Sequence, residues 1–540
     1  MMTMATLKRG LLHLAVAMFA GYVLPSCSSD YEFAHLYDDL PFEMEKVERP
    51  HIPAREINIE DFGGVGDGVT LNSEAFAKAI DVLSELGGGR LTVPVGVWLT
   101  GPITLKDNIE LHVRPDAVLL FSTDRTLYPI VETVFEGLDT KRCMSPINAV
   151  GARNIAITGG GTIDGNGDSW RQVGKSKVSP SQWKELLASG GFTNAKGDVW
   201  YPDSTSFRGS VVSDDFNVPQ GLSTDEEWES VKTYLRPVMI SFKECENVLL
   251  EDCLFQNSPC WNIHPLMCRN VIIDNVTVRN PWYSQNGDGL DVDSCENVLV
   301  INSSFDVGDD AICIKSGKNE DGRRRARPCR NLIIDNNVVF HGHGGFVVGS
   351  EMSGGVQNIK VSDCRFLGTD VGLRFKSCRG RGGVVENIYI SDIVMMNIST
   401  EPLLFDLHYN GKSAVESAEE GLSRYDVAFV PADETTPQFR DIYIKDIVCS
   451  GAARAMYFNG IPEKNIENIV VEDCEIVSDK GADLRYSTNV VLRNVDIRQS
   501  EGDGYIVTNS RNVVIDSCTD SDGTGPLKVF QYKSYNVVID

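Results

Sequence analysis

A nine-residue pattern of apolar and polar positions recurs along most of the chain. It starts with an Asn, has apolar residues one and three places later, Asn or Asp at the fifth place and an apolar residue at the eighth, as from Asn297 to Phe305. Full copies start at Asn247, Asn270, Asn297, Asn331, Asn358, Asn387, Asn468 and Asn489. The alternation predicts β-strands, and the Asn or Asp at the fifth place predicts a tight bend between two strands.

The spacing of the copies predicts how these strands are arranged. Neighbouring copies are mostly 21 to 34 residues apart, which is the repeat length of solenoids whose successive coils bury one shared core. Short strands at this period, without long amphipathic helices between them, favour a parallel β-helix over a leucine-rich repeat. We therefore predict an all-β chain whose body, residues 56–540, is a single parallel β-helix.

Two segments depart from the repeat. After Asn72 or Ser73, apolar residues with helical spacing predict a helix that covers the open end of the solenoid. These residues are Phe76, Ala79, Ile80 and Leu83. Residues 165–236 lack the pattern, and we interpret them as an insertion with helices at Pro180–Ala188 and Asp225–Tyr234.

The last strands of four coils can be aligned with one another. They are Leu290–Ser294, Ile312–Ser316, Phe346–Ser350 and Leu373–Ser377. Stacked coils place equivalent residues about 4.8 Å apart. The first and third places are apolar and should face the core, so the second and fourth places should form one external strip. That strip contains Asp291, Asp293, Lys315, Arg374 and Lys376.

Acidic residues gather just before these aligned strands. The alignment stacks Asp288 on Asp310 and places Asp309 and His343 beside them. One face of the solenoid is therefore predicted to carry carboxylates, a histidine and cations within about three coils, roughly 14 Å.

The N-terminus is typical of an exported protein. Lys8 and Arg9 precede an apolar run that is too short to span a membrane, and the run ends at Cys27. This ending resembles a bacterial lipoprotein processing site, so we predict a signal peptide over residues 1–27 and a lipid anchor at Cys27. The alternative is an ordinary signal with a chance cysteine. Residues 28–55 are acidic and suit a tether. We expect an exported monomer at the cell envelope that touches the membrane only through this anchor.

The charge of the chain limits its partners. A formal net charge of −26 argues against nucleic acid as a partner. An acidic polysaccharide would also be repelled, so binding it would require local cations. Such cations occur beside the carboxylates, at Arg323, Arg324, Arg325, Arg327 and Arg330. A solvated loop is the alternative interpretation of this run.

The cysteines follow the repeat. Several fall two residues before a starting Asn, namely Cys245, Cys268, Cys295 and Cys329. This register predicts small apolar residues stacked in the wall of the solenoid rather than a disulfide framework. No spacing suggests a zinc site.

Four short motifs resemble a known family when they are taken together. Asn286-Gly-Asp288, Gly308-Asp309-Asp310, Gly342-His343-Gly344 and Arg374-Phe-Lys376 resemble, in order, those of glycoside hydrolase family 28, the polygalacturonases. The resemblance covers residues 56–540, and longer stretches are similar to the bacterial, often exo-acting branch. Two departures stand out. The family usually has Asn-Thr-Asp in the first motif, and the segment around His343 is one residue longer, so that His343 rather than His341 is assigned.

The resemblance implies a right-handed, pectin-lyase-like solenoid without a metal or cofactor. It also implies inverting hydrolysis of α-1,4-linked galacturonic acid in pectin or oligogalacturonides, and we expect exo action. Inversion commonly uses an acid and a base about 6.5–9.5 Å apart. By analogy Asp309 is the acid, while Asp288 and Asp310 position and deprotonate water. His343 would tune the acid or bind a neighbouring sugar.

The resemblance also assigns substrate-binding residues. Arg374 and Lys376 would hold a galacturonate carboxylate through charge-assisted hydrogen bonds. Lys315 is a weaker candidate for the same task, and Asn286 belongs to the same site.

Three other functions fit parts of the sequence. A rhamnogalacturonan hydrolase is the nearest. A pectate lyase would use the acidic cluster to hold Ca²⁺ and Arg374 as the base of an elimination. A non-catalytic glycan-binding solenoid would use neither.

Overall fold

The computed structural model describes residues 31–213, 215–409, 423–521 and 526–540. The predicted signal peptide and Cys27 lie outside these residues. The chain divides into two compact units, Met1–Asp39 and Leu40–Asp540. The described part of the first unit contains one 3-10 turn, η1 (Ala34–Tyr37). In the residues described, no helix has the length and apolar character needed to cross a lipid bilayer.

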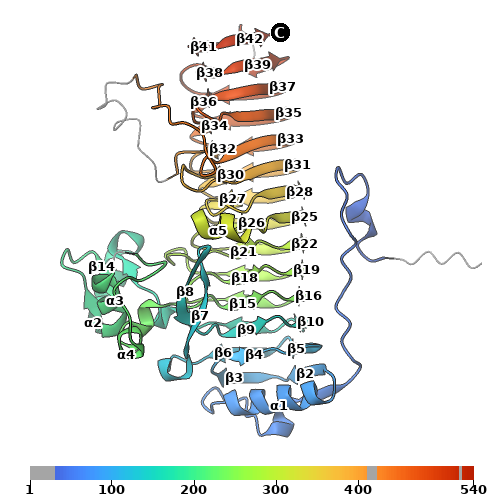
Figure 1. Ribbon diagram of the computed structural model, residues 1–540, viewed down its shortest axis with the longest axis vertical. Helices are drawn as coiled ribbons and strands as arrows, with labels where there is room; N and C mark the ends of the chain where they lie inside the picture. The colour runs from blue at the N-terminus through green and yellow to red at the C-terminus, as the bar shows by residue number, and fades with distance from the viewer. Residues whose placement is uncertain (1–30, 214, 410–422, 522–525) are drawn as a thin grey trace, which may run out of the picture. The chain divides into compact units, whose positions relative to one another are not determined.

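The second unit is the predicted right-handed parallel β-helix (Figure 1). Its two main sheets contain 24 and 13 strands, and successive coils pair in parallel throughout both. The smaller sheet carries the last strand of each coil. Its strands are β4 (Ile103–Thr104), β9 (Ile147–Val150), β15 (Ile240–Lys243), β18 (Ile263–Leu266), β21 (Leu290–Asp293), β24 (Asp310–Lys315), β27 (Gly344–Gly349), β30 (Val371–Lys376), β32 (Leu403–Asp406), β34 (Arg454–Asn459), β36 (Lys480–Arg485), β38 (Tyr505–Thr508) and β41 (Val529–Tyr532).

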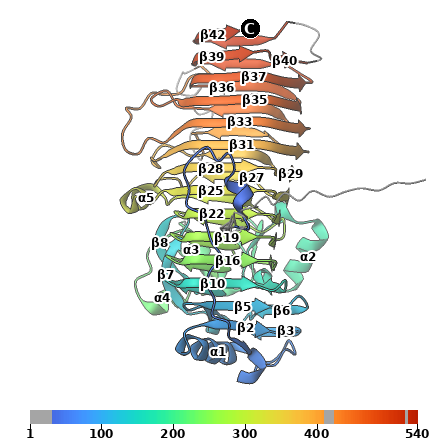
Figure 2. The same ribbon diagram turned by 90° about the vertical axis from the view of Figure 1, so that its right-hand side faces the viewer.

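The larger sheet carries the strands that start at the repeated Asn and those that follow the bend. The first row is β1 (Glu56–Asn58), β2 (Gly89–Val93), β5 (Ile109–Val113), β10 (Arg153–Thr158), β16 (Glu246–Glu251), β19 (Arg269–Asp274), β22 (Glu296–Ile301), β25 (Cys329–Asp335), β28 (Val356–Ser362), β31 (Val384–Met396), β33 (Gln438–Ser450), β35 (Ile466–Ser478), β37 (Ser487–Gln499), β39 (Arg511–Asp516) and β42 (Tyr535–Ile539). The second row is β3 (Gly96–Thr100), β6 (Ala117–Phe121), β11 (Thr162–Asp164), β17 (Leu254–Gln256), β20 (Thr277–Arg279), β23 (Ser304–Asp306), β26 (Val338–His341), β29 (Arg365–Leu367) and β40 (Thr519–Asp520). Figure 2 shows these strands edge to edge along the solenoid.

The repeated Asn residues bend the chain and also join the coils. Asn270, Asn297 and Asn331 have φ between 56° and 61°, the left-handed conformation that Asn tolerates better than most residues. Each donates its side-chain amide to the Asn before it, for example Asn297 Nδ2 to Asn270 Oδ1 at 3.2 Å. The position five places later also has a positive φ, as at Asn302. The predicted bends are therefore present, and a ladder of amides runs along the solenoid.

The aligned strands have the predicted register. Leu290 pairs with Ile312, Ile312 with Phe346, and Phe346 with Leu373. These side chains are fully buried, and burial of each contributes about 1.5–3 kcal/mol relative to exposure. Because the apolar places repeat in every coil, the outward-facing places line up as well.

Helix α1 (Ser73–Glu85) packs its predicted apolar face against the first coils and closes that end of the solenoid (Figure 1). Asn72 does not cap the helix with its side chain. It donates instead to the carbonyls of Val65, Thr70 and Leu99, and so fixes the preceding loop.

Between β11 and β15 the chain forms a projecting insertion (Figure 1). Its elements are η4 (Gly167–Ser169), β12 (Val173–Gly174), η5 (Lys175–Lys177), α2 (Pro180–Ala188), β13 (Phe192–Thr193), β14 (Val199–Tyr201), α3 (Ser204–Val212), α4 (Asp225–Glu229) and η6 (Lys232–Tyr234). Helix α2 has the predicted bounds. The second predicted helix ends at Glu229 and gives way to a 3-10 turn. Helix α3, which begins after the Asp203 cap, was not predicted.

The segment expected to be a tether belongs in part to the solenoid unit, which begins at Leu40 rather than at residue 56. Glu45 pairs with Arg269 of β19, and Arg49 pairs with Glu251 of β16. Val47 between them is fully buried. The acidic character of this stretch therefore serves contacts along the larger sheet.

The cysteines of the described residues are all free thiols. Cys245, Cys268, Cys295 and Cys329 are buried in the wall of the solenoid. The backbone N–H of Cys268 donates to Cys295 Sγ at 3.3 Å. Their repeat register therefore reflects stacking of small side chains, as predicted.

Candidate active site

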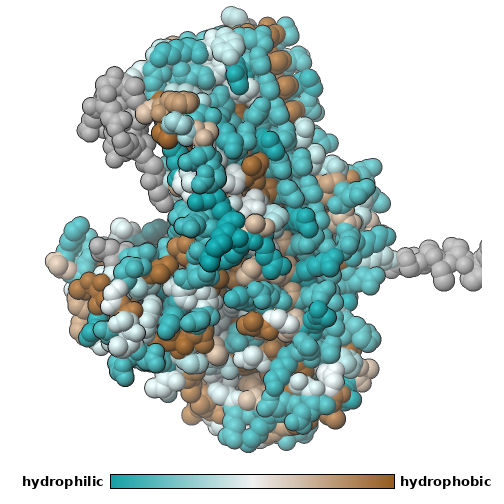
Figure 3. All heavy atoms as spheres, in the orientation of Figure 1, coloured by the Kyte–Doolittle hydropathy of each residue, from teal (hydrophilic) through white to brown (hydrophobic). Residues whose placement is uncertain are grey.

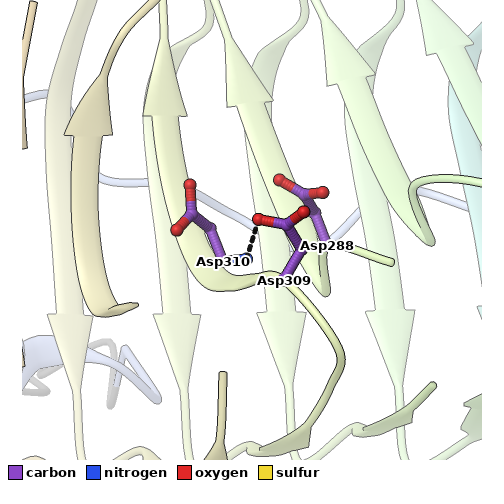
Figure 4. Close-up of side chains that lie close together, drawn as sticks. All are labelled: Asp288, Asp309 and Asp310. Carbon is purple, nitrogen blue, oxygen red and sulfur yellow. Dashed lines mark hydrogen bonds between the residues drawn. The ribbon is translucent and has the colours of Figure 1, made fainter. Parts of the chain in front are cut away.

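Three carboxyl groups from adjacent coils meet at the start of β21 and β24 (Figure 4). Asp288 precedes β21, and Asp309 and Asp310 lie at the start of β24. One oxygen from each lies within 4.8 Å of the others. The backbone N–H of Asp310 donates to Asp309 Oδ1 at 3.1 Å. Residues distant in sequence therefore share one small volume, as the coil alignment predicts.

Glycines bring these carboxyls together. A Cβ at Gly287 would lie 1.9 Å from Ser284 Oγ, and a Cβ at Gly308 would lie 2.5 Å from the same atom. Ser284 Oγ is held by the carbonyl of Pro281 at 2.6 Å. The loop packs so closely on Gly287 that no side chain fits at this position. This explains why Gly stands in Asn-Gly-Asp where the family usually has Thr.

Asp288 lies in surroundings that favour its protonated form. It is 4% exposed. Burial, followed by the neighbouring carboxylates of Asp291 and Asp309, raises the pKa of Asp288 well above its ordinary range. Because closely coupled carboxyls titrate as a group, the cluster retains a proton that isolated carboxyls would have lost.

Asp310 has the opposite environment. Burial alone would raise the pKa of Asp310, but Lys376 and Arg374 outweigh that effect and hold the pKa below its usual range. Lys376 Nζ lies 2.7 Å from Asp310 Oδ2, and Arg374 Nη1 lies 3.2 Å from Oδ1. The three carboxyls are close enough together to bind a metal cation. However, the ammonium group of Lys376 and the guanidinium group of Arg374 already neutralise Asp310. This disfavours Ca²⁺.

Asp309 is the most accessible of the three. Its side chain is 24% exposed, against 1% for Asp310. His343 Nδ1 lies 3.1 Å from Asp309 Oδ1, and this hydrogen bond raises the pKa of His343. His341 instead lies 2.8 Å from Asp306 on the exposed rim. The structure therefore brings His343, and not His341, to the acidic cluster.

Arg374 and Lys376 have one partner that the sequence did not reveal. The Tyr409 ring lies 4.9 Å from Lys376 Nζ and 5.8 Å from Arg374 Cζ. Arg374 Nε is buried without a hydrogen-bond partner among the described residues. Tyr409 belongs to no motif, although its position just after β32 places it one coil beyond Lys376.

Lys315 does not reach the opening that was expected for it. It is 3% exposed, and its Nζ lies 3.1 Å from Glu351 Oε2 and 3.5 Å from Asp291 Oδ1. The ring of Trp261 covers it at 4.7 Å. Asp291 and Asp293 are likewise fully buried. Part of the strip that we expected to be external is therefore buried. Lys315 acts there as a buried counter-charge to Glu351 and Asp291.

Asn286 lies at the closed corner of the site. Its Oδ1 accepts from Arg236 Nη2 at 3.1 Å, and its Nδ2 donates to Glu136 Oε1 at 3.3 Å. Lys318 Nζ lies 3.4 Å from Glu136 Oε2. Glu136 and Lys318 are both partly exposed. They add polar groups that sequence reasoning did not identify.

A hairpin closes the strip on the N-terminal side of the cluster. It consists of β7 (Ile130–Phe135) and β8 (Leu138–Cys143) and crosses the face of the smaller sheet (Figure 1). Phe135 stacks on Trp261 with ring centroids 5.2 Å apart. Val134 packs on Leu266 of β18 and on Met267. Because β18 is the neighbour of β21, this cover begins one coil before Asp288.

The arginine run fixes this hairpin. Residues Asn319–Arg325 form a short helix, α5. Arg324 and Arg325 pair with Asp139 of the hairpin at 3.2 and 2.8 Å. Arg325 Nη1 also donates to the carbonyl of Gly137 at 2.9 Å. These two arginines are therefore structural contacts rather than an unpaired cationic patch, and they hold the wall of the cleft.

The carboxyl spacing differs from the expected one. The nearest oxygens lie within 4.8 Å, which is less than the about 6.5–9.5 Å between carboxyl groups that is common in inverting glycosidases. Coil stacking, which holds neighbouring rungs about 4.8 Å apart, brings Asp288 close to Asp310, whereas Asp309 and Asp310 are neighbours in the sequence at the start of one strand.

The insertion and the coils that follow it define an open notch on this side of the molecule. The space-filling view shows the insertion projecting below the notch (Figure 3). Contacts between side chains place the predicted residues Asp288, Asp309, Asp310, His343, Arg374 and Lys376 together. Asn286 lies beside Arg236 and Glu136, and Lys315 is buried.

Comparison with known proteins places this geometry in a family. The sequence model of glycosyl hydrolases family 28 matches residues 224–452. A "Probable polygalacturonase" of Vitis vinifera is 29% identical over 433 residues, 78% of this chain and 74% of that protein. An exo-poly-alpha-D-galacturonosidase of Dickeya chrysanthemi is 28% identical over 76% of this chain, which spans 65% of that protein's length.

The structural comparison extends further along the chain. The crystal structure of a hyperthermoactive exopolygalacturonase from Thermotoga maritima superposes with a TM-score of 0.68 and 34% sequence identity. The match covers 84% of this chain and 93% of that one. The match covers most of the solenoid, and the carboxyls and cations of the site lie on one face of it. The chain therefore belongs to glycosyl hydrolases family 28 and is a glycoside hydrolase.

Proposed function

We propose that the chain hydrolyses α-1,4-linked galacturonic acid in pectic polygalacturonate and releases it from a chain end. The observation that supports this most directly is the contact between Asp310 and the Arg374–Lys376 pair. It places a carboxylate-binding pair of cations beside three carboxyl groups.

Each carboxyl has a role that suits its surroundings. Asp309, the accessible member, donates a proton to the glycosidic oxygen as the bond from that oxygen to the anomeric carbon breaks. Asp310, which stays ionised, accepts a proton from the water that attacks the anomeric carbon from the other side. Asp288 holds the proton of the resting cluster, passes it to the neighbouring Asp309 when substrate is bound, and then orients the water as a carboxylate. The products are two saturated sugars, and the acid is restored by return of the proton within the cluster.

We infer exo action from the hairpin that closes one side of the acidic cluster. The hairpin covers the coil next to Asp288 through Phe135 and Trp261, and α5 fixes its tip. On the other side, the smaller sheet continues with β32, where Asp406 pairs in register with Lys376. A polymer can therefore extend in one direction only, and we propose that a single galacturonate fits between the cut and the wall.

Time-resolved ¹H NMR of a pentagalacturonide digest tests this proposal. We expect free galacturonate as the only early small product, together with a tetramer, and the β-anomer before mutarotation. Mixed dimers and trimers at early times would exclude exo action. An initial α-anomer would exclude inversion, and unsaturated ends absorbing in the ultraviolet would indicate a lyase.

Substitution of Arg374 should weaken discrimination for the uronate. Arg374→Gln removes a charge-assisted donor, so kcat/KM for digalacturonate should fall by about 10- to 100-fold. The value for its methyl ester should change much less. The measurement is the ratio of kcat/KM for the two substrates. Arg365→Gln, at an exposed position of strand β29, is the matched control. An equal loss for acid and ester would show that Arg374 acts only through Asp310 and would contradict the proposed role.

A further inference from the structure

A second concave polar site lies in the C-terminal coils. It is a pocket of about 440 Å³, a size within the range of ligand sites. The lining residues that matter for its chemistry are Lys464, Asn465, Tyr486, Asn509, Arg511 and Tyr535. No residue of the acidic cluster lines it.

The fold separates this pocket from the cleft. The acidic cluster lies where the chain enters β21 and β24, whereas the pocket lies where the chain leaves β34, β36, β38 and β41. Figure 1 shows these strands several coils beyond β24. The two sites therefore occupy opposite ends of the strands as well as different coils.

The floor of the pocket is a column of stacked residues. Successive strands of the larger sheet pair Glu467 with Thr488, Thr488 with Arg511, and Arg511 with Tyr535. The loop that follows β34 forms one wall and contributes Lys464 and Asn465. Because the column repeats once per coil, its donors are spaced about 4.8 Å apart.

Two cations in this pocket lack an acidic partner. Arg511 Nε donates to Thr488 Oγ1 at 3.1 Å, and Lys464 Nζ donates weakly to the carbonyl of Thr436 at 3.4 Å. Neither has a carboxylate of the described residues within ion-pair distance, 4.0 Å. Burial, together with nearby Arg440, lowers the pKa of Lys464, as expected for a cation without a counter-charge.

One of the two acids of the lining is already neutralised. Glu463 is held by Arg379, with Nε at 2.5 Å from Oε1. Glu467 accepts from the neutral amide Gln438 Nε2 at 3.1 Å, and among the described residues no cation lies within ion-pair distance of it, because Arg440 in the neighbouring strand pairs with Glu386. Lys464 and Arg511 therefore exceed the one unpaired carboxylate of the lining, Glu467. In a chain of net charge −26, this local excess of positive charge favours an anionic ligand.

We propose that this pocket is a second, non-catalytic binding site for uronic-acid oligosaccharides. Lys464 and Arg511 bind a carboxylate, and the exposed Tyr535 ring offers a face to a pyranose. The side-chain carbonyl oxygens of Asn465 and Asn509 accept from sugar hydroxyls, because their N–H groups already donate to Thr488 and to the carbonyl of Tyr425. The identity of the sugar rests on the proposed function. If the pocket binds one part of a polysaccharide whose end lies at the acidic cluster, it would raise the local concentration of chain ends there.

Isothermal titration with digalacturonate tests the proposal, in an Asp309→Asn background that suppresses hydrolysis. We expect two classes of site. Lys464→Gln with Arg511→Gln should weaken one class by at least about tenfold and leave the other unchanged. The matched control removes two paired surface cations elsewhere in the same coils, through Lys480→Gln and Arg498→Gln. Thermal melts and the two single variants verify folding.

The outcomes separate this proposal from the catalytic one. A single class of site that is unaffected by Lys464→Gln and Arg511→Gln would overturn it, as would an equal effect of the control pair. Equal binding of neutral galactobiose in the pocket would also overturn it. If the catalytic proposal fails instead, Arg374→Gln will leave both classes unchanged, while the pocket variants still remove one.

Discussion

Asp309→Asn should lower kcat on oligogalacturonides by about 10²- to 10⁴-fold, the usual contribution of a general acid. The amide has the size of the carboxyl and can still accept the hydrogen bonds from His343 and from the backbone N–H of Asp310. It cannot deliver a proton to the glycosidic oxygen. The measurement is kcat for trigalacturonide at saturating substrate, together with the dissociation constant, which should change little.

The leaving group identifies the role of Asp309. Fluoride departs from α-galacturonosyl fluoride without protonation, so Asp309→Asn should lose far less activity on this substrate than on trigalacturonide. Asp306→Asn is the matched control, because Asp306 lies nearby on β23 and contacts His341 instead of the cluster. An equal loss on both substrates would show that Asp309 does not act as the acid.

The coil register and the catalytic neighbourhood could be predicted because both follow from repetition. Apolar places that recur in every coil fix which residues face inward. The pairing of Leu290 with Ile312 then follows, and Asp288 comes to lie beside Asp310 without any further information. The Asn ladder strengthens the same register, since each Asn donates to the one before it.

Features that come from outside the repeat could not be predicted. The position of Lys315 on its strand predicts an external side chain, but Trp261 and the hairpin cover it. The alternation of residues along a strand does not indicate which other segments pack on that strand. The arginines of α5 find their partner Asp139 about 185 residues earlier in the chain. Tyr409 follows an ordinary strand and carries no motif. Each depends on a loop whose path the local sequence does not determine.

Asp310→Asn should destabilise the folded chain by about 3–5 kcal/mol at neutral pH, because removal of one partner leaves buried cations without their counter-charge. Lys376 and Arg374 both contact this carboxylate. Since the pKa of Asp310 is lowered by folding, its contribution is present above the ordinary carboxyl pKa of about 3.9 and is lost as the pH falls below that value. The melting-temperature deficit of the variant should therefore be full at pH 5.5 and 7.5 and smaller at pH 3.

Asp288→Asn should have the opposite effect, although both carboxyls belong to one cluster. Burial and the neighbouring carboxylates raise the pKa of Asp288, so the unfolded chain loses this proton at lower pH than the folded chain does. Wild-type stability therefore falls as the pH rises from about 3.9 through the raised pKa. An amide, which mimics the protonated carboxyl, avoids that loss. Calorimetric melting temperatures at pH 3, 5.5 and 7.5 should show little difference at pH 3 and a growing advantage for the variant above it. A deficit that grows with pH would mean that Asp288 is ionised in the folded chain, and the proton of the resting cluster would then have to lie elsewhere.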